Sequence, residues 1–139
     1  MDKSERYVEK CREAVKIQGS RPSPKRGDVW WSVAWNQAAL FTEKEWQFID
    51  DPFNGLRIEE RRFQRGFYDR FTWLPRQDQL QNMVREEYVS ARKMMVHFGQ
   101  WCLEYGDVHA SGEELWFDFV MKTKYGEVWN GEEWIKDPE

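Results

Sequence analysis

The feature that most constrains the fold is a regular apolar pattern between Pro75 and Tyr105. Apolar side chains recur there at alternating four- and three-residue steps, at Leu80, Val84, Tyr88, Ala91, Met95, Phe98, Cys102 and Tyr105. Such steps return to the same side of an α-helix, so the pattern predicts one long helix with a continuous apolar stripe. Pro75 suits the first helical position because its φ is already helical and it has no amide hydrogen. We expect the helix to be buried on more than a narrow seam, with a weak point at Gly99.

The segments before this helix predict a sheet. Trp73 and Leu74 should be extended, because a proline disfavours helical geometry in the residue before it. Residues 29–35 are rich in aromatic and β-branched side chains and predict a strand, which Asn36-Gln37 can turn back into a second strand over residues 38–42. Residues 43–49 fit a strand or a helix equally well. Residues 50–55, Asp-Asp-Pro-Phe-Asn-Gly, have the composition of a turn.

Two further helices and a second hairpin are expected near the ends of the chain. Residues 4–18 have an amphipathic pattern with Ser4 as N-cap, and Ser111-Gly-Glu-Glu114 is a capping box that should start another helix. Asn130-Gly131 lies between two tryptophans, which is a strong hairpin signal. We therefore predict an α+β fold, with both hairpins in one small antiparallel sheet packed by the long central helix and a second C-terminal helix.

The length of 139 residues suits one ordinary domain. We expect residues 1–19 to form an N-terminal amphipathic helix, residues 20–28 a linker with two prolines, and residues 29–139 a single α+β domain. Aromatic residues make up 17% of the chain, which is enough to build a core although 33% of residues are charged.

No pattern typical of catalysis occurs in the sequence. The two cysteines, Cys11 and Cys102, have no neighbour at metal-ligand spacing, and His97 and His109 have no sequence partner that suggests a catalytic pair. We expect a protein that is not an enzyme, with no metal and no cofactor. No apolar run approaches the ~18 residues that cross a bilayer, so we expect a cytoplasmic protein without a membrane partner.

Charge is distributed unevenly along the chain, whose net charge is −4. Residues 57–103 contain six acids and nine bases, whereas residues 104–139 contain ten acids and three bases. The basic part includes a segment in which arginines alternate with aromatic rings, and its candidate contact residues are Arg61, Arg62, Arg65, Tyr68 and Arg70. This composition suits a single-stranded nucleic acid surface, but it also suits an amphipathic segment whose arginines pair with nearby carboxylates.

Two motifs resemble those of a known group of proteins. Residues 73–81, Trp-Leu-Pro-Arg-Gln-Asp-Gln-Leu-Gln, and residues 121–134, which include Lys-Tyr-Gly-Glu-Val-Trp-Asn-Gly-Glu-Glu-Trp, resemble a family of small uncharacterised proteins encoded by phages and prophages of Gram-positive bacteria. Residues 27–31, Gly-Asp-Val-Trp-Trp, are similar to a further feature of that family. The resemblance supplies no catalytic residue and no ligand. It implies a bacterial setting in which small proteins without catalytic motifs often act by binding.

We therefore expect a phage or prophage accessory protein that binds a host or phage macromolecule, a protein in preference to a nucleic acid. The first alternative is single-stranded nucleic-acid binding through residues 57–71. The second is a small-molecule or nucleotide-binding pocket lined by aromatic side chains. The regular stripe of the long helix can also pair with a second copy of itself, which would give a homodimer.

Overall fold

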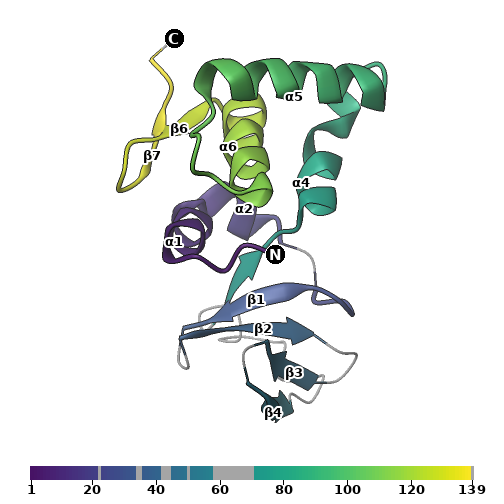
Figure 1. The fold of residues 1–139 in the computed structure, drawn as a ribbon, viewed down its shortest axis with the longest axis vertical. Helices are drawn as coiled ribbons and strands as arrows, with labels where there is room; N and C mark the ends of the chain where they lie inside the picture. Colours follow the sequence, from purple (N-terminus) through teal and green to yellow (C-terminus); the bar gives the residue numbers. More distant parts are fainter. Residues whose placement is uncertain (22, 34–35, 42–44, 50, 58–70, 139) are drawn as a thin grey trace. The chain divides into compact units, whose positions relative to one another are not determined.

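The structure is a computed structural model that describes residues 1–21, 23–33, 36–41, 45–49, 51–57 and 71–138 (Figure 1). The protein has an α+β fold, as the sequence predicts. It forms two compact units. We call residues 3–74 the sheet unit, and residues 75–139 together with Met1 and Asp2 the helical unit. The expected division into residues 1–19, 20–28 and 29–139 stays a prediction.

The sheet unit has a five-stranded antiparallel sheet in the order β4-β3-β2-β1-β5. The strands are β1 (Val29–Ser32), β2 (Gln37–Phe41), β3 (Glu45–Phe48), β4 (Asp51–Arg57) and β5 (Phe71–Leu74). The predicted hairpin is confirmed as β1 and β2, and Asn36 turns the chain with a positive φ of 52°. The predicted extended Trp73-Leu74 pair is confirmed as part of β5, which pairs with β1.

Two short helices, α1 (Glu5–Glu13) and α2 (Val15–Gly19), belong to the same unit. Ser4 is the predicted N-cap, and its hydroxyl accepts from the Tyr7 amide at 3.2 Å. Helix α1 packs against β5. The Gln18 side chain donates to the Trp73 carbonyl at 2.9 Å and accepts from the Trp73 amide at 3.0 Å. This side chain therefore pairs with the outer edge of β5 as a neighbouring strand would.

The predicted turn over residues 50–55 is wrong, because Asp51–Gly55 lie in β4. Proline cannot donate a ladder hydrogen bond and is found at sheet edges, and β4 is an edge strand, so Pro52 is compatible with the observed strand. Within residues 43–49, which fit a strand or a helix by sequence, Glu45–Phe48 form strand β3. Strand β4 shows that turn-forming composition does not decide local structure when a neighbouring strand offers backbone partners.

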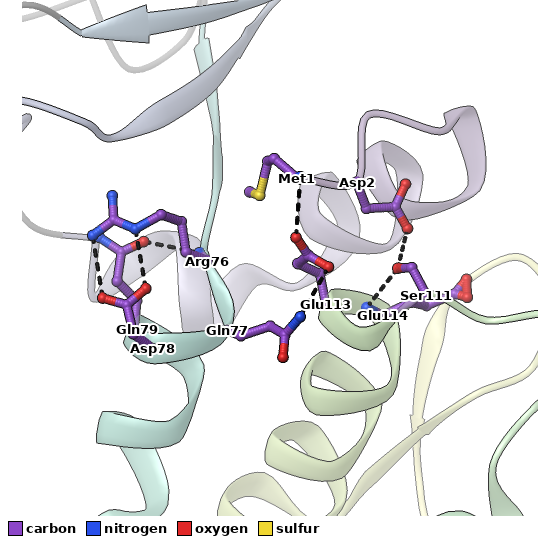
Figure 2. Close-up of polar contacts among 9 residues, drawn as sticks. All are labelled: Met1, Asp2, Arg76, Gln77, Asp78, Gln79, Ser111, Glu113 and Glu114. Carbon is purple, nitrogen blue, oxygen red and sulfur yellow. Dashed lines mark hydrogen bonds and ion pairs between the residues drawn. The ribbon is translucent and has the colours of Figure 1, made fainter.

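The helical unit contains α4 (Gln77–Val84), a 3₁₀ turn (Arg85–Glu87), α5 (Ala91–Tyr105), α6 (Gly112–Tyr125), β6 (Glu127–Trp129) and β7 (Trp134–Lys136). Helices α4 and α6 pack against each other, and the starts of both carry a polar network (Figure 2). The Gln77 amide contacts the Glu113 carboxylate at 3.4 Å, and the Ser111 hydroxyl bonds to Asp2. Ser111 also accepts from the Glu114 amide at 3.1 Å, which confirms the predicted N-cap.

The predicted single helix from Pro75 to Tyr105 is wrong, because the chain leaves helical geometry before α5. Tyr88 is extended, with φ −121° and ψ 144°, and the Ser90 hydroxyl accepts from the Lys93 amide at 3.2 Å as the N-cap of a new helix. Helix α4 also begins two residues after Pro75. The break therefore lies at residues 85–90, and Gly99 sits within regular helix.

The two hairpins do not share a sheet, which corrects a second expectation. Strands β6 and β7 form a separate two-stranded sheet. The hairpin itself is confirmed: Trp129 lies opposite Trp134, with ring centroids 5.3 Å apart. The Asn130 side chain accepts from the amides of Glu132 and Glu133 at 2.8 Å each, so the connection is a four-residue loop closed by an asparagine.

Candidate functional site

The predicted contact residues Arg61, Arg62, Arg65, Tyr68 and Arg70 lie outside the described residues. The proposed role of that segment stays a prediction. The surface of α5 is the part of the described chain that presents the clearest candidate site, and it includes Met95, which the sequence pattern assigns to the core.

The inner face of α5 is held by an aromatic cluster. Phe98 stacks on Trp116 of α6, with centroids 3.6 Å apart and planes at 12°. Phe119 is fully buried. Its ring makes edge-on or tilted contacts with four other rings at centroid distances of 5.3–5.8 Å, those of His97, Phe98, Trp101 and Trp116. Ring pairs of this geometry contribute roughly 0.5–1.5 kcal/mol beyond burial. This cluster fixes which side of α5 faces α6 and which side faces outward.

The outer face of α5 carries apolar side chains that α6 does not cover. We define the outer strip as Met95, Val96, Gly99 and Leu103, whose three- and four-residue spacing places them on one side of the helix. Met95 is 47% exposed, Val96 56% and Leu103 92%. The expectation that the long helix is buried on more than a narrow seam is therefore wrong for α5, where Met94 is the one fully buried side chain.

The two ends of α5 have opposite charge. Arg92 and Lys93 lie in its first turn, and Glu104 lies in its last turn. All three side chains are exposed, and none of them takes part in an ion pair with a described residue. This arrangement opposes the helix dipole at both ends, which costs about 0.3–1 kcal/mol for each exposed charge. A complementary charge from outside would offset that cost.

An open hollow of about 670 Å³ adjoins the start of the outer strip. Its lining is Tyr88, Ser90, Arg92, Lys93, Val96, His97 and Gln100. The lining supplies two permanent cations, two hydroxyls, an imidazole and an amide, and it includes no carboxylate. A surface of this composition favours an anionic group, such as a carboxylate or a phosphate.

Two of the residues that line this hollow, Tyr88 and His97, are joined by a hydrogen bond. The Tyr88 hydroxyl and the His97 Nδ1 atom are 2.5 Å apart, and the two ring centroids are 5.6 Å apart. Burial raises the pKa of Tyr88 above its ordinary value, the negative charge of Glu87 raises it further, and a hydrogen bond with Thr123 acts in the opposite direction. The neutral phenol is therefore the form that the fold favours.

We predict that Tyr88 makes the protein less stable in strong base. Because the pKa of Tyr88 is raised in the folded protein, its neutral phenol contributes to stability. This contribution is complete below the pKa of an unfolded tyrosine and is lost as the pH rises through the pKa of Tyr88 in the folded protein. The free energy of unfolding should fall from about pH 10 upward, and Tyr88→Phe should make this fall smaller. Urea denaturation between pH 9 and pH 11 measures the difference. Equal pH dependence in both proteins would contradict the assignment.

Other kinds of site have less support in the described part of the chain. Within those residues there is no group of three or more histidine, cysteine or acidic side chains arranged to hold a metal ion. Cys11 and Cys102 are free thiols, and burial together with Asp118 raises the pKa of Cys102, which disfavours its reactive thiolate. Among the same residues, no helix has the length and apolar character to cross a membrane.

The fold and surface define an α+β protein that displays a partly apolar helix with charged ends. Comparison of the chain with protein-family models, with curated proteins and with solved structures found no match. The outer strip was not predicted from the sequence as a site. The signal that could have located it is Leu103, an apolar residue next to Glu104 and outside the predicted stripe.

Proposed function

We propose that this protein acts by binding another protein through the outer face of α5 and that it has no catalytic role. The observation that carries the proposal is the outer strip, where three large apolar side chains are 47%, 56% and 92% exposed on a helix whose opposite face is anchored. Clustered apolar side chains on a rigid surface mark interaction sites more often than isolated ones do. A phage or prophage accessory role in a bacterial cytoplasm is part of the same proposal.

The charges around the strip specify the chemistry of the partner. An apolar helix face would cover Met95, Val96 and Leu103, and a carboxylate would lie beside Arg92 and Lys93 at the hollow. A basic group would lie near Glu104. Helical segments recognise one another through apolar residues at such three- and four-residue spacings, and charges at the margin select the partner and its direction.

A photo-reactive benzophenone amino acid in place of Leu103 tests this function in growing Gram-positive cells. We expect irradiation to link the protein covalently to one main partner, because position 103 lies within the contact. The matched control places the same amino acid at Val15, which is also apolar and 78% exposed but belongs to α2 in the sheet unit. No specific adduct from position 103, or the same adducts from both positions, would overturn the proposal.

The two other hypotheses stay predictions. Nucleic-acid binding through residues 57–71 stays a prediction, because residues 58–70 lie outside the described part of the chain. An aromatic-lined pocket also stays a prediction. The hollow beside α5 has Tyr88 and His97 in its lining but no tryptophan, and it is open to solvent.

A further inference from the structure

We infer that the outer strip of α5 binds the outer strip of a second copy of this chain, with the two helices antiparallel and crossing at Gly99. The inference rests on the proposed function, because it names the partner that the α5 surface binds. Three features support it: the position of Gly99, the pairing of the apolar side chains, and the order of charges along the helix.

Gly99 lies in the middle of the outer strip, between Met95 and Leu103 at four-residue spacing on either side. A Cβ atom added at Gly99 would meet no atom within 4 Å, so the space above it is open. No contact within the described part of the chain therefore requires a glycine here, although glycine weakens a helix interior by about 1 kcal/mol relative to alanine. A glycine at a crossing point lets two helix backbones approach closely, which supplies a reason for its presence.

The apolar side chains are complementary when two copies cross at this residue. Twofold symmetry about Gly99 places Met95 of one copy opposite Leu103 of the other, and the same contact occurs twice because the interface is isologous. Val96 lies beside each of these contacts. Helix α5 has 15 residues, so the contact would extend along about 22 Å.

The charges select the antiparallel direction. In that arrangement Lys93 of each copy lies near Glu104 of the other copy, because residues 93 and 104 are almost equally far from Gly99 in opposite directions. A parallel pair would place lysine beside lysine and glutamate beside glutamate. Antiparallel pairing also brings each basic helix start close to the negative end of the neighbouring helix dipole. The charges that are unfavourable in a single chain become favourable in the pair.

We expect this pair to be reversible. One helix from each chain gives a contact at the small end of the range for specific interfaces, so the dissociation constant should be on the order of 10 µM. The full-length protein should therefore change from monomer to dimer over an accessible concentration range, which sedimentation equilibrium measures directly.

Charge reversal of Lys93 and Glu104 tests both the partner and the direction. The two variants are Lys93→Glu and Glu104→Lys. Both side chains are exposed in the wild-type protein, so each variant should fold. Circular dichroism checks the folding of each variant. Each variant alone should self-associate about 10-fold more weakly, because like charges meet at both ends of the contact. An equimolar mixture should form a heterodimer with the wild-type affinity. The double variant, with both changes in one chain, should recover self-association.

The outcomes separate this inference from the proposed function. A protein that stays monomeric while the benzophenone at position 103 links it to a different protein would overturn the second-copy inference and leave the proposed function supported. A wild-type dimer whose affinity none of the charge variants changes would overturn the antiparallel α5 contact. Two results together support the proposed function and the second-copy inference. They are a crosslinked adduct of twice the chain mass from position 103 and wild-type affinity in the mixture of the two charge variants.

Discussion

Replacing Phe119 with alanine should lower the free energy of unfolding of the helical unit by about 3–5 kcal/mol, the usual cost of truncating a buried phenylalanine. Phe119 is fully buried and contacts the rings of three residues on α5 as well as Trp116. Its removal would leave a cavity between α5 and α6 where those rings now meet. Urea denaturation followed by helical circular dichroism measures the loss.

Two control substitutions separate the contribution of packing at Phe119 from the effect of alanine on the helix itself. Phe119→Leu keeps most of the apolar volume and should cost less than half as much as alanine. Leu103→Ala removes an apolar side chain from α5 that is 92% exposed, so the monomer should lose less than about 0.5 kcal/mol. A loss below about 1 kcal/mol for Phe119→Ala would show that the aromatic cluster does not hold α5 in place.

Local signals in the sequence predicted the ends of several elements correctly. Ser4 and Ser111 cap their helices as expected. The hairpin between Trp129 and Trp134 also forms. These features depend on interactions within about four residues, so the chain itself contains the information needed to predict them.

The break before α5 was missed because the apolar spacing continues across it. The 3₁₀ turn and the extended residue Tyr88 interrupt the helix without interrupting that spacing. Helix α5 therefore starts as a separate helix, in which Met94 is buried, Phe98 stacks on Trp116 of α6, and Met95 is 47% exposed. Ser90, a favourable N-cap residue, was the local signal for this restart.

The candidate site could not be predicted from the apolar spacing alone. A pattern of spacing identifies one side of a helix, but it does not identify what covers that side. Met95 was assigned to the core, whereas the structure places it in the outer strip with Val96 and Leu103. The separation of the two hairpins into different sheets could not be predicted either, because strand pairing between distant segments leaves no local trace.

Leu103→Glu should weaken self-association by about 100-fold or more. The side chain is 92% exposed in the single chain and would be covered by Met95 of the second copy in the antiparallel pair. A carboxylate at this position would lose part of its hydration against the apolar Met95 side chain of the second copy. The free energy of unfolding of the monomer should change by no more than about 0.5 kcal/mol.

Sedimentation equilibrium of the wild-type chain, Leu103→Glu and Val15→Glu gives the most direct test of the proposal that α5 is a binding surface. Val15→Glu introduces the same charge at another exposed apolar residue, in the sheet unit. We predict a reversible dimer for the wild type and for Val15→Glu, and a monomer for Leu103→Glu at the same concentrations. Equal dissociation constants for the wild type and Leu103→Glu would contradict the account.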